Sequence, residues 1–435
     1  MYRRINFHKK IDLFEFEKII SSTQIDLSIK KLGIAFSGGL DSLALLFLLK
    51  KFSEKNKLKL ISMIVDHGLR YNSSKDSIDT KIISEKIGVE ARIFRWEGEK
   101  PRSGIMEKAR DARYEILTDA CKKLGIKNLF LAHHLDDQIE TYLMREKRSK
   151  NHLGLACMES VSINNGVCLV RPFLEKPKKL LKDICQKNKL KWIEDPSNFN
   201  QKFERVRIRK YLQKTKLEKK IFIESRINYF RNKKKEMDIH LNKFIKEEII
   251  FFPYGLFSFD RGVFKDCISL FQIELIRKLL RICSGKKYPP SYKSSKSLKE
   301  KIISGNIKNN TLHSCIVSIN NNRVLIYRES NKTQNNVDDD FVVLPNEVKI
   351  WDHRFIVKSF EKTLHLKKIV NKDWNFIKKL FFSKCKRTLP LKIIKTLPLI
   401  LIEENYFIPF ICDKNTLETK GISFYFKDFN MDSKK

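Results

Sequence analysis

The sequence predicts an α/β protein, in which a mostly parallel, doubly wound sheet is followed by a helical middle domain and a small α+β domain. Three observations support this class. From Lys31 onward, apolar runs typical of buried strands alternate with helical stretches, as in a parallel sheet with crossover helices on both faces. A glycine-rich turn joins the first strand to the first of these helices. From Tyr211 the composition changes, and basic helical stretches and short strands replace the alternation.

The elements follow from apolar patterning and from turn residues. In the first half we expect a helix over 7–20, strands at 33–36, 58–65, 89–96 and 129–132, and helices at 44–49, 73–87, 103–124 and 136–145. In the second half we expect a basic helix over 226–246, a hairpin over 311–326 around Asn320–Asn322, and strands within 348–360. The expected boundaries are 1–30 for a helix and linker, 31–215 for the sheet domain, 216–335 for the middle domain and 336–435 for the last.

Composition restricts the class of protein. The chain has 88 Lys and Arg against 51 Asp and Glu, a net charge of +37, which favours a nucleic-acid partner. Codon bias toward Lys, Ile, Asn and Phe would explain part of this excess without any partner. No apolar run reaches the roughly 20 residues that a membrane helix needs, and acids follow the basic start. Nine cysteines without a Cys-x-x-Cys spacing exclude a zinc ribbon or disulfide scaffold. We therefore expect a cytoplasmic protein with small buried cysteines.

The turn Ser37-Gly38-Gly39-Leu40-Asp41-Ser42 follows a buried strand and begins a helix. Glycines let the backbone approach an anion, and the helix N-terminus offers free N–H groups and a favourable dipole. Asp41 would repel a phosphate unless a cation lies between them, which predicts Mg²⁺ held by Asp41 and phosphate oxygens. Two glycines alone would indicate only a capped turn, but the complete string is more specific. It lacks the Gly-Lys-Ser/Thr of a Walker A loop.

Clusters of polar residues also follow later strands. In parallel sheets of this kind, ligands bind at the carboxyl ends of the strands. Asp66 and His67 follow the second strand, as a ribose or base contact would, although for these residues alone a capped turn is the better explanation. Arg110 and Arg113 share one helix face, and they suit either a phosphate or a surface lattice of salt bridges.

The fourth strand ends in His133-His134-Leu135-Asp136-Asp137, and Glu140 lies one turn beyond Asp137. This spacing is unusual for zinc, so an amine or Mg²⁺ fits better. A helix cap with solvated neighbours explains the acids equally well.

In this order and spacing, four motifs resemble those of tRNA(Ile)-lysidine synthetases, a family of PP-loop ATP-pyrophosphatases. They are Ser37–Ser42, Asp66–Arg70, Ala109–Tyr114 and Ala132–Thr141. The resemblance continues at Arg171–Leu174, Glu194–Asn198 and Arg205–Arg209, and is patchy beyond residue 210. It implies a PP-loop nucleotide-binding fold for the catalytic domain 31–215 and tRNA binding by 216–335 and 336–435.

The resemblance also implies a two-step reaction on the CAU-anticodon isoleucine tRNA that decodes AUA. ATP would bind through Ser37, Gly38, Gly39, Leu40, Asp41 and Ser42, with its adenosine near Asp66 and His67. The C2 oxygen of the wobble cytidine attacks the α-phosphate, which releases pyrophosphate. The ε-amine of free lysine then attacks C2 and AMP leaves. The product, lysidine, pairs with A instead of G, which changes the specificity from methionine to isoleucine.

Residue roles follow from the same resemblance. The expected catalytic residues are Asp41 with Mg²⁺, Arg113, His133 and Asp137. Asp137 and Glu140 would hold an amine of lysine, and His133 would help to deprotonate the attacking one. Arg148, Arg205 and Arg209 would contact the tRNA. The implied partners are this tRNA and free lysine, without a membrane, and a homodimer is left open.

Two departures from the family pattern stand out. This chain lacks three glycines of the family's glycine-rich loop and has Ser149, Asn151 and Cys157 in their places. It also has Val206 where the family usually has Asn. Two other classes of function are compatible with such a chain. Another adenylating enzyme, a tRNA thiolase or an amidotransferase-type synthetase, would need paired cysteines or an ammonia source. A non-enzymatic RNA-binding protein would not need Asp41, Arg113 or Asp137.

Overall fold

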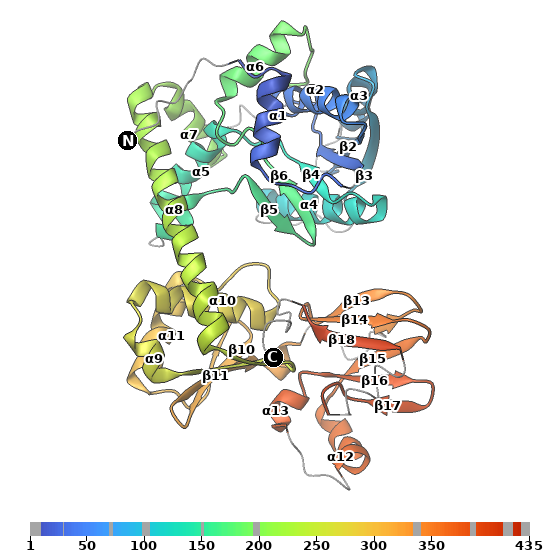
Figure 1. The fold of residues 1–435 in the computed structure, drawn as a ribbon, viewed down its shortest axis with the longest axis vertical. Helices are drawn as coiled ribbons and strands as arrows, with labels where there is room; N and C mark the ends of the chain where they lie inside the picture. Colours follow the sequence, from blue (N-terminus) through green and yellow to red (C-terminus); the bar gives the residue numbers. More distant parts are fainter. Residues whose placement is uncertain are drawn as a thin grey trace. The chain divides into compact units, whose positions relative to one another are not determined.

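The computed structural model divides the chain into two compact units, residues 1–234 and 235–435 (Figure 1). It describes residues 10–28, 30–68, 73–97, 105–148, 152–194, 201–333, 341–382, 389–411 and 421–427. The expected domain boundaries at 30, 215 and 335 stay predictions. Of the helices in these ranges, none has the length and apolarity needed to cross a lipid bilayer.

The first unit is built on a six-stranded sheet of order β3-β2-β1-β4-β6-β5. Its strands are β1 (Lys31–Ala35), β2 (Lys59–Asp66), β3 (Glu90–Arg95), β4 (Asn128–Phe130), β5 (Val161–Asn164) and β6 (Val167–Val170). Every neighbouring pair is parallel except β5 with β6, which form an antiparallel hairpin at one edge. The predicted doubly wound, mostly parallel sheet is confirmed.

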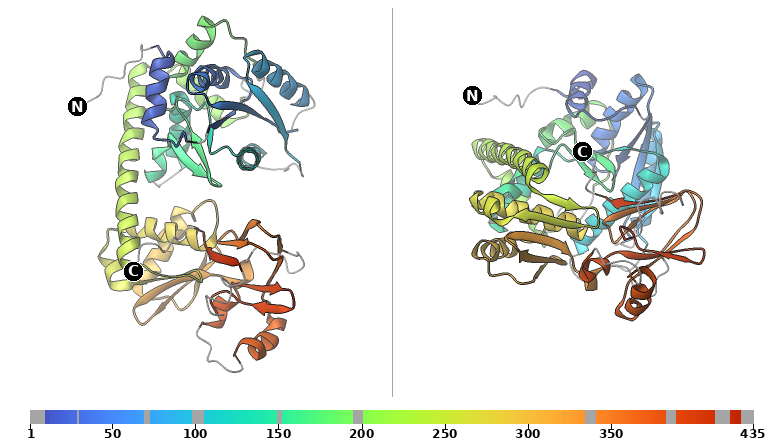
Figure 2. Two further views of the ribbon diagram at one scale, coloured as in Figure 1. Left: turned by 45° about the vertical axis from the view of Figure 1, so that its right-hand side comes forward. Right: turned by 60° about the horizontal axis from the view of Figure 1, so that its bottom comes forward.

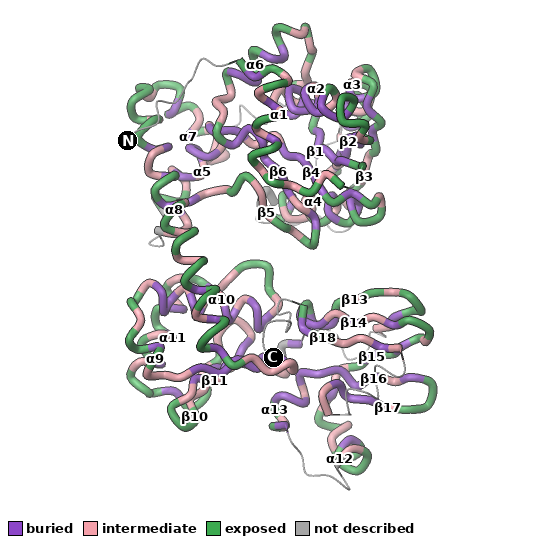
Figure 3. Tube along the Cα trace, in the orientation of Figure 1, coloured by how far each residue is buried: buried purple, intermediate pink, exposed green. Residues whose placement is uncertain are grey.

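Helices cover both faces of this sheet (Figure 2). They are α1 (Leu13–Ser22), α2 (Leu40–Lys55), α3 (Ser73–Lys86), α4 (Ile105–Leu124) and α6 (Lys178–Lys187). The helices α5 (Leu135–Arg148) and α7 (Glu204–Gln213) and the 3₁₀ turn η1 (His152–Ala156) pack together in a separate cluster. On one face, Phe16, Leu45 and Leu181 bring α1, α2 and α6 into one core. On the other, Leu117 and Cys121 of α4 pack with Met63 and Leu129. The central strands are the most continuously buried segments (Figure 3).

The helix α8 (Leu217–Glu248) begins in the first unit and ends in the second. Helices of the second unit are α9 (Arg261–Asp266), α10 (Ser269–Ser284), α11 (Tyr292–Ser304), α12 (Trp374–Phe382) and α13 (Leu391–Ile394), with 3₁₀ turns η3 (Ser330–Lys332) and η4 (Asn371–Asp373). The strands β7 (Ile250–Phe252), β8 (Leu256–Asp260), β9 (Asn310–Leu312), β10 (Cys315–Asn320) and β11 (Arg323–Arg328) form one antiparallel sheet. The hairpin β10–β11 confirms the turn expected at Asn320–Asn322.

Two smaller antiparallel sheets follow. One contains β12 (Phe341–Val343), β15 (Leu364–Lys368), β16 (Pro398–Ile402) and β17 (Asn405–Phe407). The other contains β13 (Val348–Trp351), β14 (Phe355–Ser359) and β18 (Ile422–Phe426). The middle region therefore combines helices with a five-stranded sheet, of which the sequence analysis expected only the hairpin.

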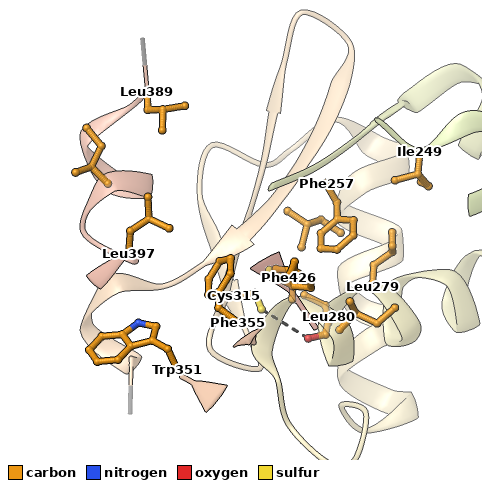
Figure 4. Packing of buried hydrophobic residues seen from close by; sticks show 14 of the residues in the cluster. Ile249, Phe257, Leu279, Leu280, Cys315, Trp351, Phe355, Leu389, Leu397 and Phe426 are labelled. Atoms are coloured by element: carbon orange, nitrogen blue, oxygen red, sulfur yellow. Dashed lines mark hydrogen bonds between the residues drawn. The ribbon is translucent and has the colours of Figure 1, made fainter. Parts of the chain in front are cut away.

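One large hydrophobic core runs through the second unit, beside a small separate cluster of Leu256, Tyr327 and Ile393. Figure 4 shows Leu279 and Leu280 of α10 beside Phe257 of β8, with Phe355 and Phe426 of the last sheet in the same cluster. A buried ion network accompanies it, because Asp352 accepts hydrogen bonds from both Arg328 and Arg354. Segments before and after residue 335 thus share one interior.

The expectation of small buried cysteines is met at four of the seven described positions, whereas Cys157, Cys168 and Cys267 are only partly buried. Cys121 and Cys185 are buried in the first unit, and Cys283 and Cys315 are buried in the second. Burial raises the pKa of both Cys121 and Cys185 to about 12. In the second unit the Cys315 thiol donates to the Leu280 carbonyl (Figure 4).

Candidate active site

The glycine turn connects β1 to α2 at the carboxyl end of the sheet. Gly38 has a φ of +73°, and a Cβ there would lie 2.7 Å from the Thr80 hydroxyl, so the position requires glycine. Gly39 precedes α2, and no side chain caps the helix. The Ser42 hydroxyl donates to the Gly39 carbonyl and accepts from the Ser37 N–H, which fixes the turn. The uncapped N–H groups at the start of α2 can therefore bind an anion.

Asp41, in the first turn of α2, lies among cationic side chains. Its Oδ2 is 3.6 Å from His134 Nε2 and 3.3 Å from Lys178 Nζ. Its Oδ1 is buried and has no hydrogen-bond partner. Burial alone would raise the pKa of this carboxyl, but His134 and Lys178 outweigh that effect and lower it. Asp41 is therefore ionised, with one oxygen left to accept a ligand.

His134 joins the glycine turn to the start of α5. Its side chain is 2% exposed, and Nε2 lies 3.4 Å from Asp137 Oδ2 as well as near Asp41. Burial opposes the charged ring, but the hydrogen bond with Asp41 and the charges of Asp41, Asp136 and Asp137 raise the pKa of His134 above its usual value. The raised pKa favours the charged form of the ring, and that charge would offset part of the negative charge of these carboxylates.

Asp137 and Glu140 of α5 face two arginines of α7. Arg205 donates to Asp137 Oδ1 at 2.7 Å and to Glu140 Oε2 at 2.6 Å. Arg209 donates to Glu140 Oε1 at 2.8 Å. Glu140 is almost fully buried, so this pairing compensates its desolvation. From the sequence, the two acids are expected to hold lysine and the two arginines to contact tRNA, and both roles stay predictions.

His133 and Arg113 lie in a positive environment nearby. Burial, together with the charges of Arg171, Arg110, Arg113 and Arg205, holds the pKa of His133 well below its usual value. His133 is therefore neutral near pH 7 and able to accept a proton, and its Nδ1 is buried without a partner. Arg113 is half-buried and makes no hydrogen bond or ion pair with the described part of the chain. Such a guanidinium suits an anionic ligand.

Asp66 ends β2 and holds its own turn together. Its Oδ1 accepts from the Gly68 N–H at 3.0 Å, and its Oδ2 accepts from the Ser74 hydroxyl at 2.8 Å. These contacts match the capped-turn alternative, and its contact with adenosine stays a prediction. His67 lies edge-on to the Trp96 ring at 6.3 Å.

The altered loop after α5 is anchored at two points. The Arg145 guanidinium donates to the Gly154 carbonyl, and the Gln138 amide exchanges hydrogen bonds with the Met158 backbone. Cys157, which stands where the family has glycine, has a φ of +60°. The left-handed conformation is therefore kept although the glycine is lost. The Arg148 side chain lies outside the described residues, so its expected tRNA contact stays a prediction.

The basic helix expected to hold tRNA is α8, and part of it belongs to the first unit. Arg231 pairs with Glu175 and Lys234 pairs with Glu159. Phe230 is buried, with the Arg226 guanidinium 4.8 Å from its ring centroid. Tyr229, in contrast, is exposed. Several charges of this helix thus serve internal contacts.

Two side chains of the site, Lys178 and Arg171, were given no role from the sequence, although Arg171 begins a stretch that resembles the family. Lys178 reaches Asp41 from the start of α6, and its only sequence signal was its position at a helix start after a strand. Arg171 is buried and donates to the Glu159 carbonyl and the Ser162 hydroxyl. Its place after β6, at the same edge as His133, could have revealed it. Among the described residues, no group of three or more His, Cys, Asp or Glu side chains could hold a metal by itself.

Comparisons with known proteins agree with this geometry. The PP-loop domain family matches residues 13–216. A tRNA(Ile)-lysidine synthase of Rickettsia typhi is 30% identical over 408 residues, which cover 91% of this chain and 93% of that protein. One from Wolbachia sp. subsp. Brugia malayi is 30% identical over 388 residues, or 81% and 85% of the two chains. The chain therefore belongs to the tRNA(Ile)-lysidine synthase family of PP-loop enzymes.

Proposed function

We propose that this protein ligates free lysine to C2 of the wobble cytidine in the CAU-anticodon isoleucine tRNA, through an adenylated cytidine. ATP-dependent modification of tRNA follows from the family, whereas the individual steps are our proposal. One observation supports this proposal most strongly. Asp41 of the glycine turn and Asp137 of the later motif meet at the same buried imidazole, His134. The phosphate-binding turn and the acidic cluster are therefore parts of one site.

ATP fits the first part of this site. Its phosphates would lie on residues 37–42, at the uncapped start of α2, with the adenosine near Asp66 and His67. The unpartnered oxygen of Asp41 fits Mg²⁺, which prefers a carboxylate together with phosphate oxygens. When bound, Mg²⁺ would reduce the repulsion between Asp41 and the phosphates. Arg113 is free to approach the α-phosphate, where negative charge grows as the C2 oxygen attacks.

Lysine fits the second part. It arrives with two ammonium groups, and Asp137 and Glu140 provide negative charge on one side of α5. Because Arg205 contacts both acids, an incoming ammonium would share them with this arginine. The attacking ε-amine must lose a proton, and neutral His133, with an unpartnered Nδ1, supports that role. AMP then leaves and lysidine remains.

The test is an incorporation assay. The protein is incubated with ATP, Mg²⁺, radiolabelled lysine and a transcript of the isoleucine tRNA, and the label is mapped after digestion. We expect label at the wobble cytidine only. It should be absent with the Asp41→Ala variant and with an elongator methionine tRNA. Pyrophosphate release with another RNA, but without lysine label, would instead indicate a different adenylating enzyme. No ATP turnover at all would indicate an RNA-binding protein.

A further inference from the structure

A cavity lies in the first unit, beside the candidate active site. It has a volume of about 240 Å³, enough for several waters. Its apolar wall is formed by Leu135 and Ile139 of α5, Pro177 and Leu217. Its polar lining consists of Asp136, Lys179, Lys220 and Glu224. The cavity therefore combines an aliphatic wall with two carboxylates and two amines.

Glu224 of α8 is the unusual member of this lining. Its side chain is 8% exposed, and its Oε2 is buried without a hydrogen-bond partner. Burial and the charge of Glu175 raise the pKa of this carboxyl to about 7, although Arg231 opposes them. Arg231 does not satisfy it, because its guanidinium pairs with Glu175 instead. A buried, unpaired carboxyl costs stability, so a ligand that paired with it would recover that cost.

The two lysines of the lining complement Glu224. Neither Lys179 nor Lys220 makes an ion pair with the described residues. Asp136 is already engaged, since it accepts a hydrogen bond from the Lys178 N–H at 2.8 Å. A ligand in this cavity would thus meet one unpaired acid, two unpaired amines and an aliphatic wall.

We propose that this cavity binds a free aliphatic α-amino acid as its zwitterion. The ammonium group contacts Glu224, the carboxylate contacts Lys179 and Lys220, and the side chain lies against Leu135, Ile139 and Leu217. An ammonium ion alone would leave both lysines unpaired, and a carboxylate alone would leave Glu224 unpaired. The zwitterion satisfies both sets at once, and no reaction is involved.

This site is distinct from the acidic cluster on the other side of α5. Leu135 and Ile139 are four residues apart and share one helix face, which lines the cavity. Asp137 and Glu140 are three apart and share the opposite face, where they pair with α7. The proposal therefore does not depend on where the lysine of the ligation reaction binds.

The test is isothermal titration calorimetry on the full chain, without ATP or tRNA. The probe is L-norleucine, an aliphatic amino acid that lacks an ε-amine. We expect binding at one site, and a dissociation constant at least tenfold weaker in Glu224→Gln and in Lys220→Met. Asp137→Asn should bind norleucine as the unmodified chain does. Because the ammonium needs ionised Glu224, binding should be about tenfold tighter at pH 8 than at pH 6.

Two further ligands test the ammonium contact and the carboxylate contact separately. Pentylamine has only the ammonium and hexanoate only the carboxylate, so each should bind at least tenfold more weakly than norleucine. The proposal is overturned if norleucine does not bind, if either Glu224→Gln or Lys220→Met binds it normally, or if pentylamine or hexanoate binds equally well. Thermal melting confirms that each variant is folded. Since neither ATP nor tRNA takes part, failure here leaves the incorporation assay unaffected.

Discussion

Asp137 is held from two sides. Its Oδ1 accepts from Arg205 and its Oδ2 accepts from the His134 backbone N–H, so its position does not depend on a ligand. We expect Asp137→Asn to raise the KM for lysine by about tenfold to a hundredfold, because it removes a charge-assisted contact to an ammonium group. The KM for ATP should change less. Steady-state incorporation of labelled lysine, with each substrate varied in turn, measures both constants.

The matched control is Asp183→Asn, which removes the same charge from an exposed position of α6. It should leave both constants unchanged. If Asp137→Asn raised the two KM values equally, Asp137 would not be a lysine contact.

Glu224 predicts a pH-dependent stability. Its folded pKa of about 7 lies above the unfolded value of about 4.3, so the folded state binds more protons between these values. The free energy of unfolding therefore falls as the pH rises through this window, and it stays lower above about pH 7. Glu224→Gln should stabilise the chain at pH 8 by on the order of 1–3 kcal/mol, with little effect at pH 5. Thermal unfolding at the two pH values provides the comparison.

Glu218→Gln serves as the control, since Glu218 is exposed on the same helix. A stabilisation by Glu224→Gln of the same size at both pH values would contradict the argument. In that case the amide would act through packing rather than through charge.

Single residues show how far the sequence could predict the site. The glycine turn could be located because adjacent glycine, serine and aspartate residues are typical of a turn that begins a helix. The acidic cluster could be located too, and its need for a cation was foreseen. The identity of the cations was not, because Arg205 is 68 residues away from Asp137 and Lys178 reaches Asp41 from another helix. Such pairs exist only once the sheet has brought its strand ends together.

The loop after α5 carries a prediction at the scale of an element. Cys157 has a φ of +60°, which costs a residue with a Cβ about 1–2 kcal/mol. Cys157→Gly and Cys157→Ala both remove the thiol, but only glycine removes this strain. We expect the glycine variant to be more stable than the alanine variant by about 1 kcal/mol. Chemical denaturation of the two variants, side by side, measures the difference.

If the two variants had the same free energy of unfolding, the positive φ at position 157 would not strain the loop. Asn151→Gly is not a suitable substitute, because Asn151 lies outside the described residues. The comparison therefore rests on position 157 alone.

Elements with strong periodicity were predictable, and the edge hairpin was not predicted. The strands and helices up to α5 agree with the expected order, because apolar runs and helical patterns alternate clearly there. The β5–β6 hairpin was not predicted, although Asn165 and Gly166 between its strands both have positive φ. Asn-Gly between two short apolar runs is a known hairpin signal, and it could have been used. Its strands are only four residues long, which makes their pattern weak.

At the scale of the whole molecule, the buried ion network tests the integrity of the second unit. Asp352 is fully buried between Arg328 of β11 and Arg354 beside β14. Asp352→Asn should destabilise this unit by about 3–5 kcal/mol, because it leaves two buried guanidinium groups without their acid. Hydrogen exchange should then be faster in β11 and β14 but unchanged in β1. Lys362→Met, which breaks an exposed pair with Glu403, should have little effect.

Faster exchange in β1 as well would show that the two units unfold as one. The shared core of the second unit was beyond the sequence analysis. Residues such as Phe257 and Phe426 pack together across 169 positions of chain, and short strands give no sign of such distant partners. The expected boundary at residue 335 was inferred from polar composition, which reports exposure rather than packing.

Among the described residues, four cysteines are buried, two in each unit, and their reactivity would report the opening of that unit. Cys121 and Cys185 are enclosed in the first unit, and Cys283 and Cys315 in the second. Only a thiolate reacts readily with an alkylating reagent. All four thiols are buried in the folded chain, and burial raises the pKa of Cys121, Cys185 and Cys315. Mass spectrometry of alkylated peptides would therefore measure the rate at which each unit opens. Both rates would come from a single sample, without any engineered label.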